Sequence, residues 1–116
     1  MVRELPHPAT LREAAREVIS SNRRDGYPPT RFIQATEAGE ANNLSAVCSH
    51  LIVNPDTLSW LVEAVRRIRG LLFLEDLVSV YGYGLPPEVI EEAKRRCQAL
   101  DELVGGKRWI PSKVEP

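Results

Sequence analysis

The chain has 116 residues, of which 43% are hydrophobic and 27% are charged, and its formal net charge at pH 7 is -1. These values are typical of one soluble globular domain, which we expect to span residues 1–116. The presence of only two cysteines excludes a disulfide scaffold, and the overall composition excludes a collagen-like or low-complexity chain.

The first clear signal is a helix at residues 11–22. Thr10 and Glu13 have the spacing of a capping box, in which a hydroxyl and a carboxylate each satisfy a free backbone N–H. One apolar face follows at helical spacing: Leu11, Ala14, Ala15, Val18 and Ile19. We expect Gly26 to supply the left-handed turn beyond this helix, and residues 1–9 to be flexible.

The next segments predict three more helices. The prolines of Tyr27-Pro28-Pro29-Thr30 stiffen a connector, and a short helix is expected at residues 31–38 with Thr30 as its cap. A third helix has an apolar face formed by Leu44, Val47, Cys48, Leu51 and Ile52. Asn54-Pro55-Asp56 ends that helix and begins a fourth, since proline is tolerated at the first helical position.

The fourth helix is expected to carry apolar side chains on two faces. One stripe consists of Leu58, Leu61, Val62, Val65 and Ile68, and the opposite side carries Trp60, Ala64 and Leu71. Such a helix is either central in its bundle or part of an interface.

Two further segments complete the predicted fold. Residues 71–81 favour a helix, although Val78-Ser79-Val80-Tyr81 would also suit a strand. Pro86 and Pro87 open a last helix that ends before Gly105-Gly106. Residues 107–116 are expected to be a tail that Trp109 and Ile110 hold to the fold and that is flexible beyond them. The prediction is an all-α, compact bundle of five or six helices, with a folded core at residues 10–104.

One stretch resembles a known group of sequences. Gly26-Tyr27-Pro28-Pro29-Thr30-Arg31-Phe32 is similar to a segment of a group of uncharacterised small helical bacterial proteins. The similarity continues in Leu74-Glu75-Asp76-Leu77-Val78 and in a closing helix from Pro87 to Leu100, whereas residues 60–69 replace a more polar linker. The resemblance implies a helical fold and a bacterial origin, and it implies no activity.

Residues suited to catalysis or metal binding are few. Cys48-x-His50 does not have the spacing of a zinc site, and its two side chains point in different directions on a helix. The serines lie within predicted helices, without the glycine-flanked turn that exposes a nucleophile. Adjacent carboxylates such as Glu75-Asp76 diverge on a helix and do not form a ligand set by themselves. We therefore expect no enzyme activity, no metal and no cofactor.

Arginine accounts for twelve of the fifteen basic residues, and the basic residues occur in clusters. The set that could contact the phosphates of a nucleic acid consists of Arg66, Arg67, Arg69, Lys94, Arg95 and Arg96. Acidic residues accompany these clusters, and pairs such as Glu91 and Arg95 at i, i+4 spacing are typical of a solvated helix face. We favour the solvated face and keep a nucleic-acid-binding accessory protein as the alternative function.

A protein-binding surface is the leading functional hypothesis. Its predicted residues are Trp60, Ala64, Arg67 and Leu71, and the partner is another protein or a second copy of this chain. The alternative is that Trp60 takes part in no interface, because a neighbouring helix of the same bundle covers it. Tyr27 and Arg31 form a second candidate site in the connector.

The sequence also indicates where this binding or adaptor module acts. The first twenty residues carry acidic and basic side chains and lack the apolar core of a secretory signal. The longest apolar run, Leu71 to Leu74, is too short to span a bilayer. Both cysteines lie on apolar helix faces, which favours buried, reduced thiols. We expect a cytoplasmic protein without a membrane partner.

Overall fold

The computed structural model describes residues 2–41 and 43–111, with the side chains of residues 39–41 outside this description. Most of the described chain is helical: α1 (Leu11–Arg24), α2 (Thr30–Ala41), α3 (Leu44–Val53), α4 (Pro55–Arg67), α5 (Leu74–Tyr81) and α6 (Pro87–Leu103). Two short strands, β1 (Arg3–Glu4) and β2 (Trp109–Ile110), flank the helices. The predicted all-α bundle of five or six helices is confirmed.

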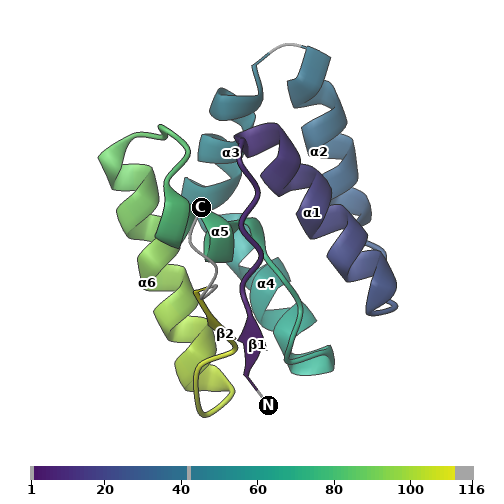
Figure 1. The fold of residues 1–116 in the computed structure, drawn as a ribbon, viewed down its shortest axis with the longest axis vertical. Coiled ribbons are helices and arrows are strands. Elements are labelled where there is room, and N and C mark those ends of the chain that lie inside the picture. Colours follow the sequence, from purple (N-terminus) through teal and green to yellow (C-terminus); the bar gives the residue numbers. More distant parts are fainter. Residues whose placement is uncertain (1, 42, 112–116) are drawn as a thin grey trace.

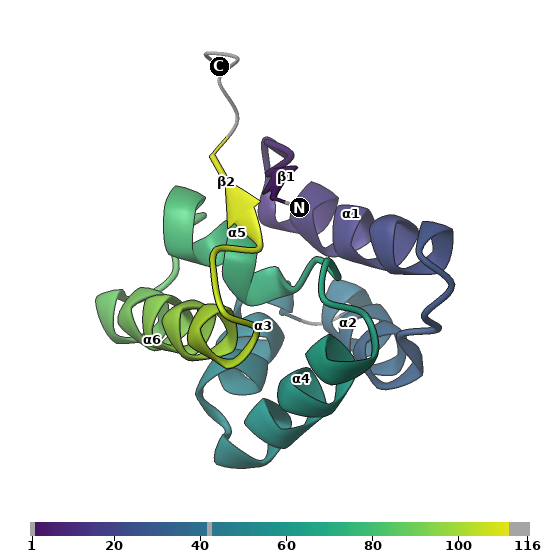
Figure 2. The ribbon, with the colours of Figure 1, turned by 90° about the horizontal axis from the view of Figure 1, so that it is seen from below.

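Helix α5 lies in the middle of the fold, although it is the shortest helix. Helix α6 lies on one side of it and α1 with α2 on the other (Figure 1), and a second view also places α5 at the centre (Figure 2). Every residue from Leu71 to Val78 is buried. The segment therefore connects the two groups of core side chains. The first group contains Val18, Ile52, Leu72, Leu77 and Val89 among others, and the second contains Ala64, Val65, Leu71, Phe73 and Leu100.

The signals at the ends of α1 act as predicted, with one difference. The hydroxyl of Thr10 accepts the backbone N–H of Glu13 at 3.1 Å. The carboxylate of Glu13 accepts the backbone N–H of Ala9 at 3.0 Å rather than that of Thr10. The helix extends to Arg24, and Gly26 follows with a positive φ of 81°. Both ends of α1 are thus stabilised by residues next to it in the sequence.

The region between α4 and α5 differs from the prediction. Helix α4 ends at Arg67, and α5 begins at Leu74 rather than at residue 71. Residues 71–73 are non-helical and carry three apolar side chains into the core. The strand alternative for residues 78–81 is not observed, because they form the second half of α5.

Residues 3–5 and 108–110 lie outside the predicted folded core of residues 10–104 but pack against it, and the expected contacts of Trp109 and Ile110 are part of this packing. Strands β1 and β2 pair in parallel, with Arg3 opposite Trp109 and Glu4 opposite Ile110. The N–H of Leu5 donates to the carbonyl of Ile110 at 2.7 Å, and the Leu5 side chain is 1% exposed. Backbone pairing and apolar burial order these segments although they lie over 100 residues apart. The predicted flexibility of residue 1 and residues 112–116 lies outside the described residues.

The burial of Leu5 leads to a test of the N-terminal segment. We expect Leu5→Ala to lower the free energy of unfolding by about 2–5 kcal/mol, because it removes buried methyl groups and leaves a cavity. Val2→Ala shortens a side chain that is 46% exposed, and it should change stability by no more than about 0.5 kcal/mol. Denaturant unfolding of both variants and of the unaltered protein measures these changes in the free energy of unfolding. Equal, small effects would mean that residues 2–5 contribute nothing to the fold.

Candidate functional site

The first turn of α5 is buried together with two carboxylates, Glu75 and Asp76. The Asp76 carboxylate accepts the N–H of Phe73 at 2.9 Å, which caps the start of the helix. Negative side chains are favoured at a helix N-terminus, where free N–H groups and the helix dipole create positive potential. Burying two charges nevertheless requires partners, because each loses its hydration.

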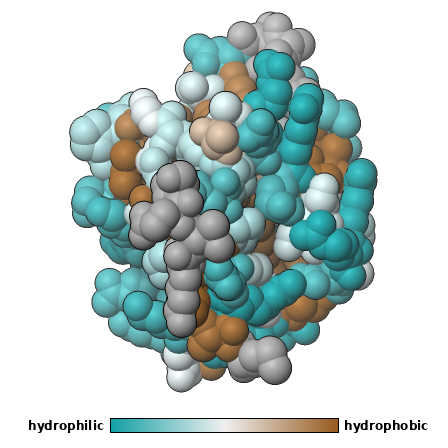
Figure 3. All heavy atoms as spheres, in the orientation of Figure 1, coloured by the Kyte–Doolittle hydropathy of each residue, from teal (hydrophilic) through white to brown (hydrophobic). Residues whose placement is uncertain are grey.

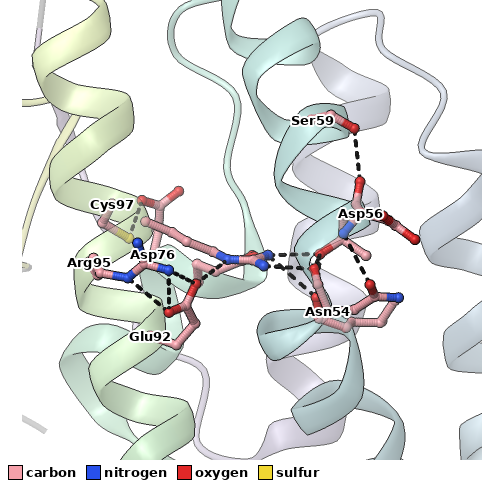
Figure 4. A network of polar contacts seen from close by, with 11 residues as sticks. Asn54, Asp56, Ser59, Asp76, Glu92, Arg95 and Cys97 are labelled. Atoms are coloured by element: carbon pink, nitrogen blue, oxygen red, sulfur yellow. Dashed lines mark hydrogen bonds and ion pairs between the residues drawn. The ribbon is translucent and has the colours of Figure 1, made fainter.

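Arg96 is the partner of Glu75. Its side chain is 1% exposed, and Nη1 donates to Glu75 Oε2 at 3.2 Å. Nε donates to Glu92 Oε2 at 2.9 Å. Figure 4 shows this network between α6, which carries Glu92, and the α3–α4 junction, which carries Asn54. The remaining N–H groups of Arg96 reach Thr57 Oγ1 (2.8 Å) and the carbonyls of Asn54 (2.8 Å) and Leu51 (3.4 Å). The guanidinium thereby joins α3, α4, α5 and α6.

Arg108 is the partner of Asp76. Its Nη2 donates to Asp76 Oδ1 at 2.7 Å, and its Nε donates to Asp101 Oδ1 at 2.8 Å. The side chain is 1% exposed, and its Cζ lies 5.6 Å from the centre of the Phe73 ring. An arginine just beyond α6 therefore fixes the C-terminal segment to the start of α5.

The structure places the predicted nucleic-acid contacts in different environments, some buried and some exposed. The prediction is wrong for Arg96, because a buried guanidinium with all its neighbours inside the protein cannot reach phosphate. Arg67 pairs with Glu63 on the surface of α4, and Lys94 and Arg95 pair with Glu91 and Glu92 on α6. Arg66 is exposed, and Arg69 donates to the carbonyl of Lys107 at 3.4 Å. Half of this basic set, namely Arg67, Lys94 and Arg95, lies on exposed helix faces beside acidic residues.

The predicted interface also changes. Ala64 is 2% exposed and Leu71 is 0% exposed, so the interface prediction is wrong for these two residues. Ala64 lies on the side of α4 that faces the core. Leu71 lies beyond the end of α4, in a segment whose side chains pack into the same core cluster. Arg67 is exposed and Trp60 is half-buried. On the face shown in Figure 3, apolar residues form small groups separated by polar ones.

The structure brings Trp60 together with the predicted connector site. The Cζ atom of Arg31 lies 4.6 Å from the centre of the Trp60 ring, a cation–π contact between α2 and α4. Arg31 is exposed, and no carboxylate pairs with it among the described residues. Tyr27 lies in the same region, just before α2.

These residues line an open cavity of about 310 Å³ between α1, α2, α3 and α4 and the start of α5. Its aromatic lining consists of Tyr27, Phe32, Trp60 and Phe73, and its aliphatic lining includes Val18, Ile52, Leu61, Ala64 and Leu74. Its polar lining includes Asn22, Arg31, Glu63, Thr57 and Glu75. An apolar cavity with a few converging polar groups is the usual form of a binding site.

Burial dominates the acid–base behaviour around the cavity. It raises the pKa of Glu75 to about 7, and the nearby Arg96 only partly offsets this effect. Burial also raises the pKa of Asp76, against the opposing attraction of Arg108. For the thiols, burial raises the pKa of Cys48 to about 12 and raises the pKa of Cys97 further. Both cysteines therefore stay protonated at neutral pH, which disfavours nucleophilic chemistry.

Sequence reasoning missed the polar residues that give the cavity its chemistry, Asn22 and Glu75. The signal for Glu75 was present, because Glu75-Asp76 interrupts an apolar run that is otherwise continuous from Leu71 to Val78. Acids in such a run are either exposed or paired inside the protein. No comparable signal existed for Asn22, which occupies a core position among the polar residues at the end of α1.

Comparisons with known proteins add no family to this description. No protein-family model matches the chain, and neither the curated proteins nor the solved structures give a significant match. Among the described residues, no three histidine, cysteine, aspartate or glutamate side chains are grouped to hold a metal ion. Within the same part of the chain, each helix is too short or too polar to cross a bilayer.

Two neighbouring arginines of α6 provide a matched test of the buried network. We expect Arg96→Gln to lower the free energy of unfolding by about 3–5 kcal/mol, because it leaves Glu75 buried without its cation. Arg95→Gln removes an exposed partner of Glu92 and should cost no more than about 1 kcal/mol. Urea unfolding at pH 8 makes the comparison. Similar losses in the two variants would contradict the central role of the Arg96 network.

The raised pKa of Glu75 predicts a pH dependence of stability. Between its ordinary pKa of 4.5 and the folded value of about 7, the folded protein keeps a proton that the unfolded chain has lost. Stability due to this group therefore falls as the pH rises through this range, by about 3 kcal/mol in total. Glu75→Gln should remove this loss, whereas the exposed Glu91→Gln should retain it. Unfolding free energies at pH 5 and pH 8 test this, and an identical pH dependence in all three proteins would contradict it.

Proposed function

We propose that the protein is a small helical binding module without catalysis, and that it recognises a protein partner by taking one of its side chains into the cavity. The observation that carries this proposal is the open cavity of about 310 Å³ beneath the contact between Arg31 and Trp60. This volume is at the lower end of the range for ligand sites, which suits one side chain better than a helix or a large cofactor.

The residues at the mouth of the cavity support a protein partner. Tryptophan, tyrosine and arginine are the residues that most often dominate binding energy at protein interfaces, and Trp60, Tyr27 and Arg31 lie together here. Arg31 is already stacked on Trp60, so part of the entropy cost of ordering its long side chain is met before the partner binds. The proposed interface therefore keeps Trp60 and replaces Ala64 and Leu71 with Tyr27 and Arg31.

Two further features support a non-catalytic protein of the cytoplasm. The thiols of Cys48 and Cys97 are free, and their raised pKa values make them poor nucleophiles. Free cysteines are typical of reducing compartments. The exposed arginines that pair with acids along α4 and α6 provide a weaker basis for the nucleic-acid alternative, which we do not propose.

Binding of an apolar dye tests whether the cavity accepts a group from solvent. We expect N-phenyl-1-naphthylamine, an uncharged apolar dye, to bind with a fluorescence increase that saturates at one site per chain. Ala64→Leu places a larger side chain in the cavity wall and should weaken this binding by about tenfold or more. Ala99→Leu adds the same atoms at an exposed position of α6 and should leave the binding unchanged.

Circular dichroism and a cooperative thermal transition establish that both variants are folded. Leu61→Trp, at another position of the cavity wall, serves as a second filling variant. Absence of saturable dye binding to the unaltered protein, or equal binding by all variants, would contradict the proposed site.

A further inference from the structure

The interior of the cavity contains an unused hydrogen-bond acceptor, Asn22 Oδ1. The Asn22 side chain is 2% exposed and lines the cavity. Its amide nitrogen donates to the carbonyl of Leu72 at 2.8 Å, which fixes the orientation of the amide. No hydrogen bond between described residues is donated to Oδ1, and no fully buried side-chain oxygen among them lacks a partner, so Oδ1 is open to the cavity. Since an acceptor at such a site is stabilised by a donor, Asn22 favours a ligand with N–H or O–H groups.

Glu75 provides a second acceptor on the cavity wall. Its Oε2 accepts from Arg96, its carboxylate also accepts its own backbone N–H, and no other described side chain donates to it. Every nitrogen of the Arg96 guanidinium donates to a protein oxygen, only one N–H group of Nη2 has no acceptor among these contacts, and Arg96 is not part of the cavity lining. The polar interior of the cavity is therefore able to accept hydrogen bonds rather than donate them.

The charged groups next to the cavity also favour a ligand that donates hydrogen bonds and carries a positive charge. Four carboxylates, those of Glu75, Asp76, Glu92 and Asp101, pair with three guanidinium groups, those of Arg95, Arg96 and Arg108. In ionised form this cluster carries an excess of negative charge. Water is largely excluded there, so the excess favours a positively charged group in the cavity.

The walls of the cavity suit the stem of such a group. Four aromatic rings and several aliphatic side chains line it, and aromatic faces attract cations as well as methylene groups. A guanidinium is best bound by both oxygens of one carboxylate, but Oε2 of Glu75 is already occupied by Arg96. A lysine ammonium is compact and can direct separate N–H groups to separate acceptors.

We propose that the side chain that enters the cavity is a lysine of the partner protein, whose ammonium donates to Glu75 and to Asn22 Oδ1. The inference rests on the proposed function and names the chemistry that the cavity recognises. The stem of the lysine packs among Trp60, Phe32 and the aliphatic wall. Asn22 at the end of α1 and Glu75 at the start of α5 thereby make the site selective for charge as well as for size.

A matched pair of capped peptides tests this selectivity. N-acetyl-Gly-Lys-Gly-amide and its norleucine counterpart differ only in the ammonium group. We expect the lysine peptide to bind at least about tenfold more tightly at pH 8, since a hydrogen bond to a charged group contributes about 1.5–3 kcal/mol. Nuclear magnetic resonance titrations that follow the Trp60 indole N–H and the Asn22 amide signals give the affinities and locate the site.

Variants of the protein assign the preference to Glu75. Glu75→Gln keeps the size of the side chain and should abolish the difference between the two peptides. Glu91→Gln removes a carboxylate of α6 that is exposed and distant from the cavity lining, and it should preserve the difference. Equal binding of the two peptides to the unaltered protein would overturn the inference without any need for a folded Glu75 variant.

A free amine distinguishes a partner's lysine from a small-molecule ligand. n-Butylamine has a similar stem and ammonium but no peptide backbone, and we expect it to bind more weakly than the lysine peptide. Equal affinity would overturn the assignment to a protein partner. Dye binding without a preference for lysine would contradict this inference alone, whereas failure of dye binding would contradict the proposed function itself.

Discussion

The buried first turn of α5 is the constraint on which the rest of the structure depends. Glu75 and Asp76 stabilise the positive end of this helix, yet both are removed from water by the surrounding helices. Two arginines, Arg96 and Arg108, compensate for this loss of hydration. Because the partners come from α6 and from the segment after it, the ion pairs determine how the C-terminal third of the chain packs against the centre.

The same constraint creates the cavity. Arg96 requires several acceptors, and it obtains them at the α3–α4 junction, where Asn54, Leu51 and Thr57 contribute oxygens. This holds the start of α4 close to α6, while α2 packs against α1 and α3 (Figure 1). The space between α2 and α4 is bridged by the side chains of Arg31 and Trp60 rather than filled by a core residue. An open, partly aromatic cavity with a carboxylate at its wall results.

The cavity and the outer surface differ in how their polar and charged groups are paired. On the surface, basic and acidic residues alternate along α4 and α6, and such exposed pairs contribute little energy or selectivity. Inside, the Asn22 acceptor and the Glu75 carboxylate lie in the lining of a largely apolar cavity, where each hydrogen bond is stronger. The proposed recognition therefore depends on a few buried groups rather than on the arginine-rich faces.

The sequence by itself determined the local structure. The cap at Thr10, the turn at Gly26, the proline at the start of α4 and the apolar periodicity are properties of neighbouring residues, so the helical class and most helix positions could be predicted. Tertiary structure alone decided which side of α4 is buried, that the two chain ends pair as strands, and that Arg96 is internal while Arg95 is exposed. It also brought Tyr27 and Arg31 to Trp60 and placed Asn22 and Glu75 in the lining of one cavity. These outcomes depend on contacts between residues far apart in the chain, and helical spacing carries no information about which distant charge or apolar surface will cover a given face.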